Sequence, residues 1–293
     1  MSLKLGSTGI GSLYLGSTKI GTGYLGGSLV YLSPVPPNPN PLNLPANTVR
    51  MKFRAGHTPT TSLNNCHVSK VSSVPNVWDF TDNYFNIYYS LDDLLSSTSK
   101  PELIEVLGAN MTGVKVTSFM FSKCSNLTTV AYFDTSSVTR MSAMFQECFS
   151  LSAVPRFDTS NVTTTVFMFG YCTSLNYVPL FNTSRVTDFG SMFYHSSVRG
   201  ISKFDTSSGT IFSSMFSGCS NLTSVPQLDT SSATRMTDMF RDCVNVQSGA
   251  LALYTQASTQ ATPPTDHSGC FMNCGSNTVT GAQELESIPT DWK

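Results

Sequence analysis

The chain has 293 residues, a hydrophobic content of 40%, only 12% charged residues and a formal net charge of −1. The hydrophobic content is sufficient for a buried core, but the charged fraction is about half the roughly 25% of an ordinary soluble domain, so Ser, Thr, Asn and Gly must cover much of the surface. The small net charge argues against a nucleic-acid-binding protein and against electrostatic attachment to a membrane.

Residues 1–32 carry a ten-residue repeat, marked by Leu5-Gly6, Leu15-Gly16 and Leu25-Gly26. Gly-Ser-Thr turns separate short alternating apolar stretches, which indicates β-strands. Three strands of this length cannot enclose a core. We therefore predict that residues 1–32 form a β-repeat anchor or oligomerisation segment, which pairs with copies of itself or with another protein. The start, MSLKLGSTGIG, has no apolar h-region, so we expect no secretory signal.

Residues 33–46 contain six prolines within twelve positions. Such a segment is stiff and extended, and we predict a linker that holds the anchor apart from the rest of the chain. Residues 47–110 then predict a mixed α/β cap where the chain enters the repeats. We expect strands at 49–53 and within 68–80, and short helices at 91–95 and 102–107.

A 24-residue repeat occupies residues 111–247, with the consensus V-T-x-M-x-x-M-F-x-x-C-x-x-L-x-x-V-P-x-F-D-T-S. Its Met-Phe pairs are Met120-Phe121, Met144-Phe145, Met168-Phe169, Met192-Phe193, Met215-Phe216 and Met239-Phe240. A period of this length predicts stacked coils. Val-Pro-x-Phe predicts a short strand in a parallel sheet, the helical spacing before it predicts a short helix or 3₁₀ turn, and Asp-Thr-Ser predicts a turn stabilised by the Asp or Thr side chain. The expected fold is a leucine-rich-repeat-like solenoid with the N-terminal β-repeat segment attached.

The tail, residues 248–293, predicts a C-terminal capping coil. Phe271 and Cys274 keep the spacing of the repeat, and Leu285, Ile288 and Pro289 match its later positions. Phe271 lies 31 residues after Phe240, so an insertion separates this coil from the one before, and we expect a helix within it near 250–256. A cap is needed because the last coil of a stack would otherwise expose its apolar face.

The wording of the repeat, as in FDTSSVTRMSAMFQECFSLSAVPRFDTS, resembles the BspA-like family of leucine-rich-repeat surface proteins over about residues 111–247. That resemblance implies an adhesin, although we expect no surface anchor here of the kind those proteins carry. The N-terminal LYLGSTKIGTGYLGGSLVY resembles the start of virion proteins from phages of gut bacteria. This second resemblance implies that the β segment precedes a host-facing or decorating domain.

Three residue groups have both a structural and a functional interpretation. The cysteines that follow the Met-Phe pairs would lie about 5 Å apart in neighbouring coils, close enough for some to form disulfides. We expect them instead to be reduced core residues, because free Cys behaves as a small buried hydrophobe and Ser196 replaces it in one coil. His267, Cys270 and Cys274 could supply three ligands of a zinc site, and Cys66 or His67 could in principle supply a fourth, but the repeat already accounts for both Cys270 and Cys274. The aspartates of the Asp-Thr-Ser turns are expected to stabilise turns rather than to bind calcium or catalyse a reaction. We therefore expect no metal, no cofactor and no enzymatic activity.

The residue between Val-Pro and Phe varies from coil to coil while its neighbours hardly change. We define these positions as the variable stripe: Tyr132, Arg156, Leu180, Lys203 and Gln227. In an alternating strand they would face outward and form a line, which is how repeat proteins present binding surfaces, although exposed positions also drift without function.

From these observations we expect a non-enzymatic bacteriophage virion protein, such as a head fibre, a capsid decoration protein or a tail appendage, that is assembled in the host cytoplasm. Its expected partners are other virion proteins, bound through the N-terminal segment, and a host-surface polysaccharide or protein. We also expect a homo-oligomer, for which a trimer is one option, and neither nucleic acid nor membrane as a partner. The alternative is a BspA-like bacterial surface adhesin.

Overall fold

The computed structural model describes residues 42–293, except 64, 83–90 and 202, together with four short strands nearer the N-terminus. These four strands pair as two antiparallel hairpins: β1 (Leu13–Leu15) with β2 (Thr18–Ile20), and β3 (Thr22–Leu25) with β4 (Ser28–Tyr31). Of the three strands expected in this segment, those that end at Leu15 and Leu25 are present, and the one expected at Leu5 lies outside the described residues. Residues 32–41, which include most of the predicted linker, lie outside the described residues.

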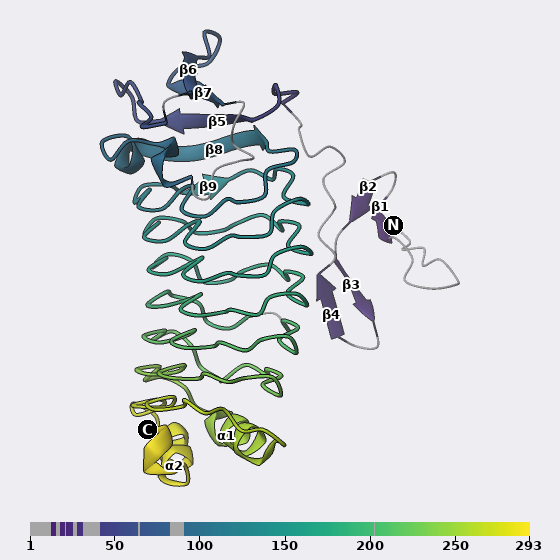
Figure 1. Cartoon of the computed structure of the whole chain (residues 1–293), viewed down its shortest axis with the longest axis vertical. Helices are drawn as coiled ribbons and strands as arrows, with labels where there is room; N and C mark the ends of the chain where they lie inside the picture. The colour runs from purple at the N-terminus through teal and green to yellow at the C-terminus, as the bar shows by residue number, and fades with distance from the viewer. Residues whose placement is uncertain are drawn as a thin grey trace.

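A five-stranded mixed sheet covers the N-terminal end of the repeats (Figure 1). Its strands are β5 (Thr48–Phe53), β6 (His67–Lys70), β7 (Val77–Thr81), β8 (Leu103–Asn110) and β9 (Thr129–Val130). The order is β6-β7-β5-β8-β9, and only the β8–β9 pair is parallel. The sheet joins the repeats because β9 belongs to the first of them.

The helix expected at 102–107 is wrong, because these residues lie in β8 or just before it. Pro101 lies in a single 3₁₀ turn, η2 (Lys100–Glu102), and the chain then extends as β8 between β5 and β9. The pairing on both edges provides backbone hydrogen bonds that an isolated short helix could not match. Near 91–95 the chain forms only the short 3₁₀ turn η1 (Asp92–Leu94).

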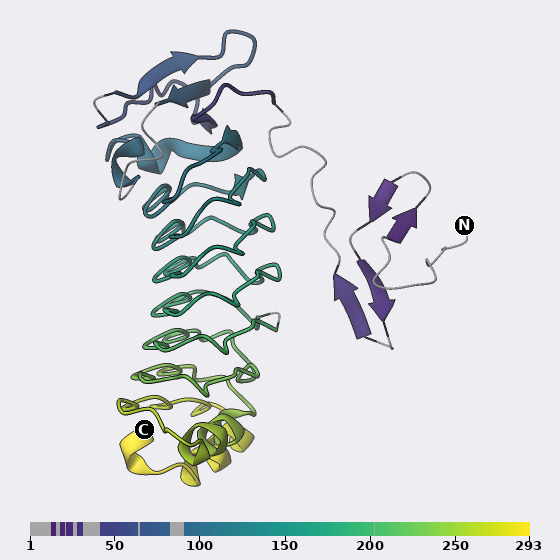
Figure 2. The ribbon, with the colours of Figure 1, turned by 45° about the vertical axis from the view of Figure 1, so that its right-hand side comes forward.

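The repeats form a column of stacked coils between the sheet and the C-terminal helices (Figures 1 and 2). On one face of each coil, which we call the turn face (residues 117–124 and their equivalents), alternate amides donate hydrogen bonds to the next coil. The Phe121 amide, for example, donates to the Met144 carbonyl at 3.0 Å. The amides between them donate within the coil, as Met120 does to the Thr117 carbonyl at 3.2 Å. Each turn face is thus a run of tight turns joined to its neighbours by a backbone ladder.

The expected leucine-rich-repeat solenoid, with a parallel strand and a short helix in each coil, is therefore wrong. The only sheet of more than two strands in the described part of the chain is the mixed five-stranded one. Beyond β9, isolated parallel bridges such as Val116–Arg140 and Arg140–Thr164 join the coils, and the Val-Pro-x-Phe segments contain no regular strand. In three of these segments Pro155, Pro179 and Pro226 remove the amide that a continuous ladder would need.

The helical spacing failed as a predictor because tight turns produce the same spacing. Val138, Met141 and Phe145 are buried at intervals of three and four residues, as on a helix face. However, Ala143 and Glu147 have φ values of 54° and 60°, in the left-handed region, which no right-handed helix contains. Equivalent residues of the other described coils repeat this pair of positive φ values.

The core of the column is a ladder of stacked side chains. Neighbouring Phe rings lie nearly parallel, as in Phe145–Phe169 with centroids 5.8 Å apart and Phe216–Phe240 at 5.2 Å. The cysteine column runs beside it, buried and without disulfides. The Cys148 thiol donates to the Phe121 carbonyl at 3.1 Å, and the same bond recurs at the equivalent positions of later coils.

Three helical segments cover the C-terminal end of the column: α1 (Ala250–Thr259), α2 (Val279–Glu286) and the 3₁₀ turn η3 (Thr290–Trp292). The structure thus has a helix where the sequence analysis expects one. Phe271 continues the ring ladder on Phe240 at 5.9 Å, and the buried Trp292 packs against it. No helix among the described residues has both the length and the apolar character needed to cross a bilayer.

Candidate functional site

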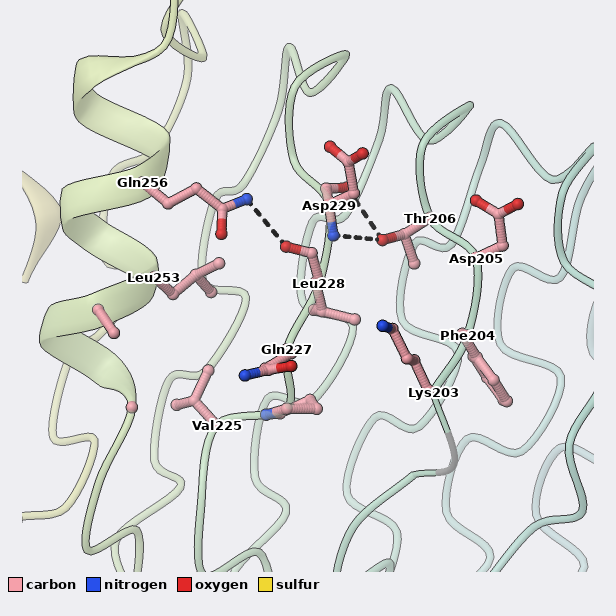
Figure 3. Close-up of a pocket in the computed structure, with 13 residues that line it drawn as sticks. Lys203, Phe204, Asp205, Thr206, Val225, Gln227, Leu228, Asp229, Leu253 and Gln256 are labelled. Atoms are coloured by element: carbon pink, nitrogen blue, oxygen red, sulfur yellow. Dashed lines mark hydrogen bonds between the residues drawn. The ribbon is translucent and has the colours of Figure 1, made fainter. Parts of the chain in front are cut away.

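A hollow of about 900 Å³ opens on the surface where the last two Val-Pro-x-Phe segments meet α1 (Figure 3). We call this feature the hollow. Its floor is apolar and consists of buried side chains: Phe204, Val225, Leu228 and Leu253. Its rim is polar and exposed: Lys203, Asp205, Gln227, Asp229 and Gln256. An apolar floor with a few polar groups around it is the usual composition of a ligand-binding pocket.

The two coils that form the hollow are joined at its edge by a threonine. Thr206 Oγ1 donates to the Asp229 carbonyl at 2.9 Å and accepts from the Asp229 amide at 2.8 Å (Figure 3). The threonines of earlier coils make the same donation to the next coil, as Thr183 does to the Asp205 carbonyl at 2.8 Å. These buried hydroxyls fix the separation of successive Asp side chains along the rim.

The two aspartates are held ionised by the turns that they stabilise. Asp205 Oδ1 accepts hydrogen bonds from the amide and hydroxyl of Ser207, at 3.1 and 2.7 Å. Asp229 Oδ1 accepts from the Ser231 amide at 2.9 Å. These bonds stabilise the carboxylate form and lower the pKa of both aspartates. The turn role expected for the Asp column is confirmed at these positions.

Helix α1 closes the hollow at its C-terminal side because it replaces the next Val-Pro-x-Phe segment. Leu251 follows Cys243 by eight residues, as Gln227 follows Cys219, so α1 lies where a sixth stripe residue would be. Gly249 begins the change of direction with φ of 97°, and a Cβ there would lie 3.0 Å from the Val225 carbonyl oxygen. Glycine is required at such a position.

Two side chains fix the helix against the coils. Glu284 of α2 accepts hydrogen bonds from the Gly249 and Leu251 amides, at 3.2 and 3.1 Å, and so satisfies free amides at the start of α1. Near the other end of α1, Gln256 Nε2 donates to the Leu228 carbonyl at 2.9 Å (Figure 3). The wall of the hollow is therefore anchored at both ends.

The structure brings two of the five stripe residues, Lys203 and Gln227, into the hollow. The other three lie at equivalent positions of preceding coils: Arg156 and Leu180 are exposed and Tyr132 is half-buried. Partial burial and the nearby carboxylates of Asp134 and Asp158 raise the pKa of Tyr132.

Three rim residues of the hollow are not among the predicted site residues. Asp205 and Asp229 were assigned only to turns, and Gln256 lies in the insertion, for which the repeat gives no alignment. Also absent from the predicted site residues is an aromatic cluster on the turn face, where the His195 ring stacks on Tyr171 at 5.5 Å and meets Tyr194 edge-on at 4.5 Å. The signal was present, because these positions also vary between coils.

The described residues do not form the zinc site that the sequence around His267 could suggest. Cys270 and Cys274 are buried in the core, and the His267 ring stacks on Trp292 with centroids 4.1 Å apart. Cys66, considered as a further ligand, directly precedes β6 of the five-stranded sheet, which lies at the opposite end of the column (Figure 1). Within the described residues no three His, Cys, Asp or Glu side chains come close enough together to hold a metal ion.

Comparison with known proteins gives one family. The family model described as "Mycoplasma protein of unknown function, DUF285" matches residues 90–198 and 177–263. No curated protein matches the chain significantly. No solved structure does so either. Because the two overlapping matches together cover more than half of the sequence, the chain belongs to the DUF285 family.

Proposed function

We propose that this protein is a non-enzymatic component of a bacteriophage virion whose column of coils binds a glycan or protein on the host surface. The observation that carries the binding role is the hollow. It joins two variable-stripe residues, Lys203 and Gln227, to two carboxylates over an apolar floor. The variable stripe, which is defined by its variation between coils, thus ends in the hollow.

The chemistry of the hollow suits a saccharide. Sugar rings have apolar C–H faces that pack on apolar side chains and hydroxyl groups that donate to carboxylates and amides. Asp205 and Asp229 accept hydrogen bonds, Lys203 donates them, and Phe204 contributes to the floor. Earlier coils add Arg156 and Tyr132, residue types that contribute strongly at many interfaces.

The spacing of the coils favours an extended ligand over a compact one. Parallel bridges join equivalent residues of successive coils, so the five stripe positions span about 20 Å at roughly 4.8 Å per step. A chain of sugar units matches such a row. The N-terminal hairpins, in this proposal, attach the protein to the particle, and the Pro-rich segment holds the column away from it. The repeat resemblance favours, as the second candidate, a BspA-like adhesin that would use the same stripe.

The test is retention of the purified protein on cells of the host bacterium. Replacing Tyr132 and Arg156 together with Ala should weaken retention at least tenfold, about 1.4 kcal/mol, and leave the melting temperature nearly unchanged. The matched control replaces Phe119 and Lys123 with Ala. These are an exposed aromatic residue and an exposed base on the turn face, and this variant should bind as the natural protein does. Undiminished retention of the Tyr132/Arg156 variant would refute a binding role for the stripe.

A further inference from the structure

We propose that the hollow is a terminal subsite: it receives the last unit of a saccharide chain that lies along the variable stripe, and it selects a neutral or amine-bearing unit. This inference rests on the proposed glycan-binding function. It adds the mode of binding, end-on rather than along an uninterrupted groove, and the charge class of the bound sugar.

The end-on mode follows from the position of α1. The stripe residues occupy one position in each of five coils, and α1 begins where the sixth would continue the row. Ala252, Leu253 and Gln256 of the helix line the hollow together with Lys203 and Gln227 of the stripe (Figure 3). A ligand that follows the stripe toward the C-terminus therefore meets a wall, and its last unit lies in the hollow.

The wall is rigid enough to act as a stop. Glu284 fixes the start of α1 through two backbone amides, and Gln256 fixes its last turns to the Leu228 carbonyl and, at 3.3 Å, to the Thr230 hydroxyl. Leu253 and Ala257 are buried against the coils. Moving the helix aside would break these hydrogen bonds and expose apolar surface.

The charge preference follows from the rim. Asp205 and Asp229 carry two negative charges, and Lys203 carries one positive charge, so the rim has a negative excess. Gln256 uses its amide nitrogen to donate to Leu228, so its oxygen is the atom that it can offer to a ligand. The two carboxylates and the Gln256 oxygen thus offer acceptors, Lys203 offers donors, and the Gln227 amide offers both. Hydroxyl and ammonium groups fit this rim, and a uronate carboxylate would be repelled.

The experiment uses linear oligosaccharides printed on arrays, one set attached through the reducing end and a second through the non-reducing end. Each set carries neutral, amino or uronate sugars at its free end. We expect the full-length protein to bind chains with neutral or amino ends at least tenfold more tightly than chains with uronate ends. Asp205→Asn with Asp229→Asn should reduce this discrimination to less than threefold. Asn182 makes the same turn bonds in another coil, so the double variant should remain folded.

A second variant tests the wall. Ala252→Trp fills the hollow from the exposed side of α1 and should reduce array binding at least tenfold. Thr259→Trp, at an exposed position of the same helix outside the hollow, is the matched control and should bind normally. Equal melting temperatures of the two variants would establish that any loss is local.

The outcomes separate this inference from the function on which it rests. If Ala252→Trp binds normally, or if uronate ends bind as well as neutral ones, the terminal subsite is refuted. If no printed sugar binds but host-cell retention still depends on Tyr132 and Arg156, the stripe has a different ligand: the binding function stands and the terminal subsite is refuted. If retention is also independent of the stripe, both proposals fail.

Discussion

Raising the pH from 8 to 10 should unfold the protein, because seven of its eight cysteines are buried. Burial raises the pKa of Cys219 and Cys274 to about 12, and it raises the pKa of the other buried thiols as well. In the unfolded chain a thiol has a pKa of about 8.5. Between these values the folded state holds protons that the unfolded state has lost, so stability falls as the pH rises.

The magnitude follows from the unfolded-state titration. At pH 10 each thiol favours the unfolded chain by about 2 kcal/mol relative to neutral pH, because the folded thiol is still protonated. Seven such thiols give on the order of 10 kcal/mol, which is comparable to the whole stability of a typical protein, about 5–15 kcal/mol. Stability should therefore fall by only about 1 kcal/mol up to pH 8 and steeply above it.

The assay is urea unfolding at intervals between pH 7 and pH 10.5 in the presence of a reductant. Cys172→Ser is the matched variant, since Ser196 occupies the equivalent position of the next coil. The variant should lose less stability with pH, by about 1.4 kcal/mol per unit at the steepest part. Stability that does not change between pH 8 and pH 10 would refute the argument, and so would native alkylation of cysteines other than the half-buried Cys66.

Three further predictions test particular parts of the column. Asp229→Ala should cost about 1 kcal/mol in urea unfolding because the turn loses its side-chain acceptor, whereas Asp229→Asn should cost little, since Asn182 makes the same bonds; equal losses would contradict this account. Gly218→Ala should cost about 1–3 kcal/mol, because φ is 74° and the new methyl group would meet the His195 ring, and His195→Ala should restore part of the loss in a double variant. Removing residues 1–32 should leave the cooperative melt of the rest intact, and loss of that melt by calorimetry would show that this segment belongs to the core.

The sequence predicts the stacking of this protein well and its local backbone poorly. The Met-Phe spacing revealed the coils, and the Asp-Thr-Ser wording revealed their turns. The left-handed backbone at Phe119, Lys123 and Glu147 could not be predicted from the sequence, because glycine and asparagine are the residue types that normally indicate this conformation. The ladder between coils stabilises these residues, and a contact between residues 23 positions apart leaves no trace in a local pattern.

The same distinction applies to the site. Lys203 and Gln227 could be predicted as site residues because they vary between repeats whose other positions are similar, and a single sequence shows such variation. Gln256 could not be selected, because its contact with Leu228 depends on how α1 folds back after an insertion that matches no other repeat. The side of the hollow that the repeats form can therefore be predicted from the sequence, and the side that α1 forms cannot.

The backbone ladder of the turn face has a direction, and this makes the column a molecular ruler. Each coil donates amides to the coil that follows, so one end of the ladder needs a donor and the other an acceptor. The Leu91 amide supplies the donor to the Ser118 carbonyl at 2.8 Å, and the Trp292 carbonyl accepts from the Phe271 amide at 2.8 Å. Both terminators lie outside the regular repeat, so adding or removing a whole coil would leave them unchanged. Gain or loss of one 24-residue unit would move the hollow by roughly 4.8 Å relative to the N-terminal sheet, which gives evolution a way to adjust reach in fixed steps.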